Sequence, residues 1–278
     1  MKEVSLLLPH PPARVYRAAV TNHSTSSPPD ALRLVYSLWT WALIALIVFV
    51  WLFWMALVYV VTVPRDPGRY TVGRWFRRAA VMSVKVNPLW KFTTSGVMIS
   101  NPRRPYVAVS NHESLADIFL ISHLPWEMKW LSKEAIFKIP LMGWLMRMAG
   151  DIPVRRADRR SRAAALEGCR DRLEKKVSVM ILPEGTRSTT KDLLPFHDGA
   201  FRLAVEMGLP ILPMAVAGTR DAMPKGSLLF RPARAEVRVL EPVETAHLTQ
   251  ADVPRLKEEI RALIGQTRDE LFREIAGG

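Results

Sequence analysis

The sequence predicts an α/β fold, with a mostly parallel central sheet flanked by helices and an N-terminal membrane helix. Two observations lead to this prediction. Beyond residue 100, short apolar runs alternate with stretches of helical pattern, which is the order expected of strand–helix–strand units around a parallel sheet. From Leu34 to Val63, thirty consecutive positions contain no Asp, Glu, Lys or Arg, and about 20 apolar residues are enough for a helix to cross a bilayer.

The N-terminal part of the chain divides into two regions. Residues 1–33 contain five prolines and the run TNHSTSS, which predicts a flexible tail. Residues 34–63 are expected to form a transmembrane or re-entrant membrane helix. One long tilted span is favoured over a hairpin, because two full crossings need roughly 40 residues. A cleaved signal peptide is disfavoured, because the apolar run is longer than a signal-peptide core.

Residues 64–100 mix basic and aromatic side chains, and we interpret them as a basic amphipathic segment at the membrane interface. A basic helix packed on the following domain is the alternative. Residues 64–83 contain five arginines and residues 14–33 contain three. Because basic residues concentrate on the cytoplasmic side, this difference favours a cytoplasmic or inner membrane whose cytoplasmic face carries the C-terminal domain.

Residues 101–278 are expected to form that domain. Its expected strands cover residues 106–110, 151–154, 177–182, 210–216 and 235–240. Its expected helices include residues 118–122, 159–176 and 199–207, followed by a last helix. In that last helix, apolar residues at helical spacing from Leu256 to Ile275 predict a face packed on the core.

The overall composition narrows the class of ligand. The chain has 39 Lys and Arg against 26 Asp and Glu, a net charge of +13, which favours anionic partners such as phosphates, nucleic acid or an acidic membrane face. A single cysteine, Cys169, excludes an internal disulfide and a Cys-ligated metal site. There is no HExxH spacing and no glycine-rich phosphate loop. We therefore expect no metal.

The run that ends at Ser110 is followed by the sequence NHESLAD, in which a histidine and an aspartate stand five positions apart. Residues five apart on a regular helix point about 140° away from each other. His112 and Asp117 therefore meet only if the helix begins after His112, as it would with Ser114 as N-cap and Asp117 as third helical residue. A cap at Ser110 paired with Glu113 would separate them. In the first arrangement Asp117 orients the ring, and His112 can take a proton from a hydroxyl group.

A second polar motif, PEGTRS, follows the apolar run at residues 177–182. Ligands bind at the carboxyl ends of strands in α/β sheets. Gly185 would let the backbone approach a ligand closely, and Arg187 offers a planar guanidinium suited to phosphate oxygens. Lys133 and Arg156 add cations near a strand end. The alternative is an ordinary turn with a solvated arginine.

Five blocks resemble, in order, the motifs of the membrane-bound glycerolipid acyltransferases, in particular the 1-acylglycerol-3-phosphate (lysophosphatidate) acyltransferases. They are NHESLAD, FKIPLMGW, GDIPVRR, PEGTRS and LPILPMAV. The resemblance implies transfer of a fatty acyl group from an acyl-CoA or acyl-carrier-protein thioester to the free hydroxyl of 1-acylglycerol 3-phosphate, giving phosphatidic acid. It also implies a lysophospholipid acceptor and a phospholipid bilayer as partners, with the thioester as co-substrate and no bound cofactor.

The resemblance also implies roles for individual residues. His112 corresponds to the general base and Asp117 to its orienting partner. Six residues fall in blocks that handle the phosphate group: Glu184, Gly185, Thr186, Arg187, Arg156 and Lys133. The chain departs from the family where it reads Phe-His-Asp-Gly at residues 196–199, since the family often has two basic residues between Phe and Gly. The departure leaves the headgroup of the acceptor open.

Other functions remain open at the level of sequence. The same motifs would serve an acyltransferase that acts on glycerol 3-phosphate, an ornithine lysolipid or another lysophospholipid. A membrane-tethered nucleic-acid-binding protein would use the positive charge for phosphate contacts, but no nucleic-acid-binding motif is present. We therefore expect no nucleic acid partner. An anchor with an inactive domain is disfavoured, because both residues expected to be catalytic are present.

Overall fold

A computed structural model describes residues 15–17, 30–188, 192–224 and 226–277. Within them the chain forms one eight-stranded sheet of order β1-β2-β8-β7-β3-β6-β4-β5. Only the β1–β2 and β7–β8 pairs are antiparallel, which confirms the predicted mostly parallel sheet. The strands are β1 (Val15–Arg17), β2 (Trp90–Val97), β3 (Val107–Ser110), β4 (Met128–Lys133), β5 (Ile152–Val154), β6 (Ser178–Ile181), β7 (Ile211–Ala217) and β8 (Ala233–Val239).

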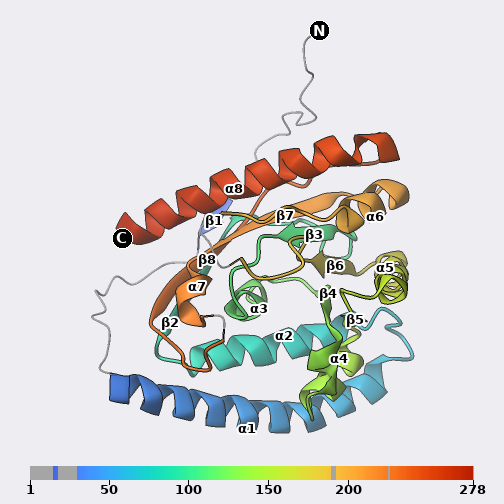
Figure 1. Cartoon of the computed structure of the whole chain (residues 1–278). Coiled ribbons are helices and arrows are strands. Elements are labelled where there is room, and N and C mark those ends of the chain that lie inside the picture. The colour runs from blue at the N-terminus through green and yellow to red at the C-terminus, as the bar shows by residue number, and fades with distance from the viewer. Residues whose placement is uncertain (1–14, 18–29, 189–191, 225, 278) are drawn as a thin grey trace.

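Helices cover both faces of the sheet (Figure 1). They are α1 (Asp30–Thr62), α2 (Tyr70–Lys85), α3 (Ala116–Ile121), α4 (Met142–Ala149), α5 (Arg159–Glu174), α6 (Gly199–Met207), α7 (Thr219–Ala222) and α8 (Val253–Gly277), with short 3₁₀ helices η1 (Glu134–Lys138) and η2 (Gln250–Asp252). In Figure 1, α8 lies above the sheet, and α2 and the long α1 lie below it.

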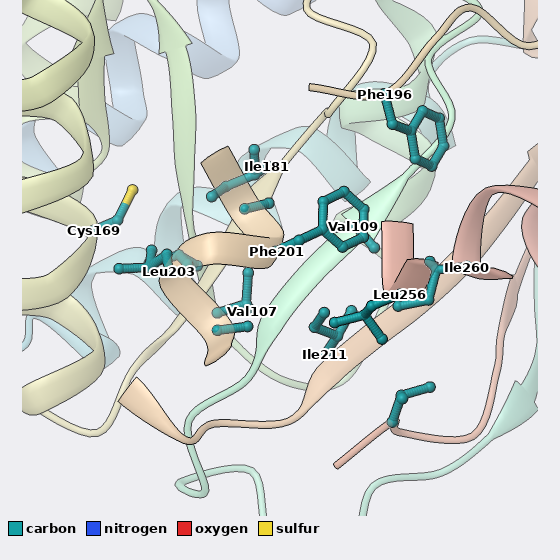
Figure 2. Close-up of a cluster of buried hydrophobic side chains, with 14 of the residues drawn as sticks. Val107, Val109, Cys169, Ile181, Phe196, Phe201, Leu203, Ile211, Leu256 and Ile260 are labelled. Atoms are coloured by element: carbon teal, nitrogen blue, oxygen red, sulfur yellow. The ribbon is translucent and has the colours of Figure 1, made fainter. Parts of the chain in front are cut away.

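The alternation of side chains along the central strands builds a core on each face of the sheet. Val107 and Val109 of β3 point toward the face covered by α5, α6 and α8, where Phe201 is fully buried among them. Figure 2 shows this cluster. Ala108 lies on the opposite face, in a cluster that includes Leu120 of α3. Because successive strand residues alternate between faces, a strand buried on both sides is apolar throughout, as predicted for the central strands.

The parallel strands place their carboxyl ends at one edge of the sheet. Ser110 at the end of β3 pairs with Met214 of β7, and Val109 pairs with Ile181 at the end of β6. Lys133 at the end of β4 pairs with Val154 at the end of β5. The loops after β3, β5 and β6 therefore start at the same edge, and they carry His112, Arg156 and the PEGTRS motif, while Lys133 ends β4.

The apolar segment is a single continuous helix rather than a hairpin. Among the described residues, one helix is long and apolar enough to cross a membrane, over Ala31–Thr62. One stripe of α1 packs on the domain along the whole helix, including Ser37, Ile44, Met55 and Val58. Its opposite side exposes large apolar side chains: Leu38, Trp39, Leu46, Phe49, Val50, Phe53, Leu57, Val60 and Val61.

Polar contacts fix both halves of α1 to the domain. Near its start, Ser37 Oγ accepts a hydrogen bond of 2.9 Å from the backbone N–H of Phe230. Further along, Trp51 Nε1 donates to the carbonyl of Trp75 on α2 at 2.8 Å. Ile44 of α1 also belongs to a buried cluster that contains Ala116, the first residue of α3. The apolar helix is thus part of the same packed body as the loop that follows β3.

The segment expected at the membrane interface contains two different elements. Residues 70–85 form the amphipathic helix α2, but its polar face is not all at the surface. Arg77 is buried and pairs with Asp151 and, at 3.6 Å, with Glu127. Trp90–Val97 forms strand β2 of the sheet, between β1 and β8, which the sequence did not predict. Trp90 of this strand is buried and Lys91 is half-buried. The mixture of basic and aromatic residues that suggested an interfacial segment here belongs to a strand.

Candidate active site

His112 lies in the loop between β3 and α3, and α3 begins at Ala116. The histidine therefore precedes the helix, and Asp117 lies in its first turn, as predicted. His112 Nδ1 is 2.7 Å from Asp117 Oδ2. Because an ionised carboxylate only accepts hydrogen bonds, Nδ1 carries the proton in this pair, and Nε2 is left with a free lone pair.

Asp117 is fully buried and receives hydrogen bonds from backbone and side chains. Its Oδ2 accepts from the backbone N–H groups of Glu113 at 2.8 Å and Ser114 at 3.1 Å. The predicted cap is wrong in detail: the N-cap is Leu115, and Ser114 Oγ instead accepts from Ala116 N–H and donates to the carbonyl of Met223. The helix starts one residue later than expected, and the side chain of Ser114 bonds to Met223, which follows α7 (Thr219–Ala222).

The PEGTRS loop holds the backbone of His112 on both sides. Glu184 Oε1 accepts from His112 N–H at 2.7 Å, and its Oε2 accepts from Leu194 N–H at 2.9 Å. The carbonyl of His112 accepts from Ser188 N–H at 2.9 Å. Burial raises the pKa of Glu184, and these two backbone donors oppose the rise. Both oxygens of Glu184 are used within the protein, so it positions His112 rather than facing a phosphate.

The cations expected at the phosphate site lie at the same edge. Arg187 is half-buried after β6, and Arg156 follows β5. Burial lowers the pKa of Arg156, and the charge of Arg187 lowers it further. Lys133 is exposed at the end of β4, beside Val154 on β5. The cations thus surround the carboxyl edge from three different strands.

A cavity of about 520 Å³ opens beside this group of cations. Its walls are mostly apolar, with Val154, Ile181 and Leu182 among them, and its lining includes Arg156 and Gly185. A site with apolar walls and a few convergent charges is typical of a small-molecule pocket.

The glycine of the PEGTRS motif is required by its geometry. Gly185 has φ of +66°, a conformation that side chains rarely adopt. A Cβ there would also lie 3.1 Å from Cδ2 and Nε2 of His197. His197 is one of the two residues, with Asp198, at which the chain departs from the family pattern, and it also lines the cavity. Thr186 is exposed.

Sequence reasoning missed Thr219, the first residue after the loop that ends β7. Its Oγ1 donates to Asp117 Oδ1. The signal was a polar residue directly after an apolar strand, in the sequence AVAGT. Asn111 is a structural support: its side-chain amide donates to the carbonyl of Val216 and accepts from the N–H of Val216. Val216 of β7 and Thr219 of α7 thus support the His112 loop through Asn111 and Asp117, respectively.

Glu113 is buried beside the dyad, and its side chain is only 2% exposed. Neither of its oxygens has a hydrogen-bond partner among the described residues. Burial raises the pKa of Glu113 to about 8, and the charges of Asp117 and Glu184 add to the rise. Arg220, at 3.6 Å, and Arg268 of α8 oppose it.

Comparison with known proteins decides the family. Residues 91–217 match the family model described as Acyltransferase. These residues therefore resemble an acyltransferase domain. The chain's resemblance to this family, suggested by five sequence blocks, is confirmed.

The similar proteins share one description. A chloroplastic 1-acyl-sn-glycerol-3-phosphate acyltransferase of Arabidopsis thaliana is 36% identical over 189 residues, which are 67% of this chain and 52% of the relative. One from Brassica napus is 40% identical over 146 residues, 52% of this chain and 42% of the relative. The chain thus spans about half the length of these curated relatives. The crystal structure of the 1-acyl-sn-glycerophosphate acyltransferase from Thermotoga maritima shares the fold, with a TM-score of 0.72 at 22% identity, over 87% of this chain and 97% of that one.

The surroundings of Glu113 predict a pH-dependent stability. Its pKa is raised from 4.5 to about 8 in the folded protein, so the folded state holds this proton more tightly than the unfolded state. The contribution of protonated Glu113 to the free energy of unfolding is complete below pH 4.5. It is lost progressively as the pH rises from 4.5 to about 8. Glu113→Gln should gain stability relative to the wild type by a few kcal/mol between pH 5 and 8.5, measured by chemical denaturation. Glu241→Gln, at an exposed position, serves as the control. An equal effect of Glu113→Gln at both pH values would contradict the assignment.

Proposed function

We propose that this protein transfers a fatty acyl group from a thioester to the free hydroxyl of 1-acylglycerol 3-phosphate, forming phosphatidic acid. The observation that carries the proposal is the buried His112–Asp117 pair, at the same strand edge as Arg156 and Arg187. His112 Nε2 takes the hydroxyl proton as the oxygen attacks the thioester carbonyl. The C–S bond then breaks, an ester C–O bond has formed, and the imidazolium returns the proton to the departing thiolate.

The geometry supports His112 as the base and Asp117 as its orienting partner. The hydrogen bond to Asp117 fixes the ring so that Nε2 is the free nitrogen, and it stabilises the imidazolium that forms during the reaction. A thioester reacts directly with an alcohol activated in this way, so no serine or cysteine nucleophile is needed. The buried Cys169 is unsuited to that role, because burial raises the pKa of its thiol to about 12.

The acceptor is assigned from charge and from the cavity. Arg187, Arg156 and Lys133 supply positive charge for a phosphate monoester, and the apolar walls beside them suit the single acyl chain of a lysophosphatidate. Glycerol 3-phosphate has no such chain, and an ornithine lysolipid has no phosphate. The relatives' names agree with this assignment, since they are called 1-acyl-sn-glycerol-3-phosphate acyltransferases. The acyl donor is an acyl-CoA or acyl-carrier-protein thioester.

We further propose that α1 lies in the surface of the membrane instead of crossing it. A crossing α1 would carry the domain packed along it, with the charged residues of α2, into the hydrocarbon region, which is strongly unfavourable. Lying flat, α1 buries its exposed apolar side in one leaflet. It then places Ala116, and with it the catalytic loop, close to the lipid surface through the cluster that contains Ile44. A cytoplasmic location of the domain is part of this proposal.

Loss of the base should abolish the reaction. His112→Ala is expected to lower kcat by about 100-fold or more and to leave the fold and membrane attachment intact. Asp117→Asn should also lower kcat severely, because the ring loses its orienting carboxylate. Transfer of labelled acyl groups to lysophosphatidate measures both, with His247→Ala, at an exposed position, as a matched control. Substantial turnover by well-folded His112→Ala enzyme would refute the base assignment.

Acceptor preference tests the phosphate site. Lysophosphatidate, glycerol 3-phosphate, lysophosphatidylcholine and an ornithine lysolipid should be offered in parallel, and lysophosphatidate is expected to have the highest kcat/KM. Arg187→Ala should reduce kcat/KM for lysophosphatidate about 10- to 150-fold, since a hydrogen bond to a charged group contributes roughly 1.5–3 kcal/mol. A preference for the zwitterionic or the ornithine lipid would overturn the acceptor and leave acyl transfer standing.

The orientation of α1 can be measured with single cysteines. Ala31→Cys and Arg65→Cys place thiols at exposed positions at the two ends of the apolar segment, while the buried Cys169 gives little background. If α1 lies in one leaflet, a membrane-impermeant thiol reagent should label both positions from the same side of sealed vesicles. Labelling from opposite sides would show that α1 crosses the bilayer.

A further inference from the structure

Two adjoining hollows follow the outer edge of β5, which is the last strand of the sheet. They have volumes of about 630 Å³ and about 320 Å³. Both are lined by Glu134, Asp151, Pro153 and Arg172, so they form one groove. Neither hollow is part of the cavity beside Gly185, and none of the candidate active-site residues described above lines either hollow. The larger hollow is lined by Arg155, which precedes Arg156 in the chain.

The smaller hollow is a cluster of arginines held by backbone carbonyl groups. Arg69 Nη1 donates to the carbonyl of Arg147 at 2.6 Å, and Arg147 Nη1 donates to that of Phe137 at 3.0 Å. Arg172 Nε donates to the carbonyl of Gly150 at 3.2 Å. Among the described residues no carboxylate pairs with Arg69 or Arg147, and the carboxylate that pairs with Arg172 is that of its neighbour Asp171. The guanidinium groups are therefore fixed in position with hydrogen-bond donors to spare.

The carboxylates that line this hollow do not cancel its charge. Asp151 is engaged by the buried Arg77. Glu134 lies 3.8 Å from Lys138 and 3.6 Å from Arg155. Burial lowers the pKa of Arg172, and the nearby charge of Arg69 contributes to the decrease. The hollow therefore has an excess of positive charge that no described side chain neutralises, which suits a ligand with phosphate groups.

The larger hollow differs in charge and leads toward the active site. Arg155, which lines this hollow, pairs with Asp158 at 3.2 Å and with Glu134. These two carboxylates compensate the charge of Arg155. The hollow runs past Ile152 and Pro153 of β5, the edge strand of the sheet. Its end at Arg155 adjoins Arg156, which lines the cavity beside Gly185.

We propose that this groove binds the donor as acyl-CoA, with the nucleotide phosphates at Arg69, Arg147 and Arg172 and the pantetheine arm along the edge of β5. The inference rests on the proposed function and specifies its donor. The groove matches the order of chemical groups in acyl-CoA: a phosphate-rich end, an amide-containing arm and a reactive thioester at the active site. A concave pocket of this size suits a nucleotide, whereas the convex surface of a carrier protein would not enter it.

The test compares two donors in a neutral detergent with saturating lysophosphatidate. Arg147→Gln is expected to raise KM for palmitoyl-CoA about 10-fold, because one charge-assisted contact is lost. It should leave KM for palmitoyl-pantetheine, which lacks the nucleotide, unchanged. Titration calorimetry with coenzyme A alone should show the same 10-fold loss of affinity. Arg202→Gln removes an exposed arginine on α6 and should change neither quantity.

Other outcomes would overturn this inference in distinguishable ways. An increase in KM for palmitoyl-acyl-carrier protein, with palmitoyl-CoA unaffected, would show a protein docking site. An increase in KM for lysophosphatidate alone would show a site for a lipid phosphate. Unchanged KM values and unchanged coenzyme A binding in well-folded Arg147→Gln would refute a ligand at these arginines. If the wild type binds coenzyme A but transfers no acyl group, the proposed function fails and the binding site stands.

Discussion

The buried carboxylate of Asp117 joins the parts of the molecule that make the candidate active site. It receives hydrogen bonds from the ring of His112, from the backbone of the loop after β3 and from Thr219 after β7. A buried carboxylate is costly unless donors surround it, so the loops after two neighbouring strands must close on it together. Glu184, after β6, holds the other side of His112. The catalytic geometry is thus a consequence of satisfying two buried acids at one sheet edge.

The same arrangement connects the candidate active site to the apolar helix α1, which we propose lies in the membrane surface. Ile44 of α1 and Ala116 of α3 share a buried cluster, so the apolar helix and the helix that carries Asp117 are packed together. An acceptor lipid would then reach the site from the bilayer, while a soluble donor would approach along the edge of β5. Two substrates of opposite solubility can meet at His112 only if the site lies at the boundary between lipid and water, which is where the proposed orientation of α1 would place it.

The features that the sequence predicted depend on local patterns. Continuous apolar runs predicted the central parallel strands, and the rotation between positions five apart on a helix required His112 to precede α3. The missed features depend on contacts between distant segments. Thr219 bonds to Asp117 from 102 positions away, and Glu184 was expected to face a phosphate, whereas it accepts from two backbone N–H groups. Strand β2 was missed because its polar residues resemble those of an interfacial segment. Its pairing with the distant strand β8 is not visible in the local sequence.

The account depends most directly on the proton of His112: Asp117 must hold it on Nδ1 and leave Nε2 free to act as the base. Nitrogen NMR of protein with ¹⁵N-labelled histidine measures this, with the signal of His112 assigned by its loss in His112→Gln. At a pH where the ring is neutral, the account predicts a protonated Nδ1 and an unprotonated Nε2, and a change in this tautomer in Asp117→Asn. A neutral His112 with its proton on Nε2, unaffected by Asp117→Asn, would contradict it.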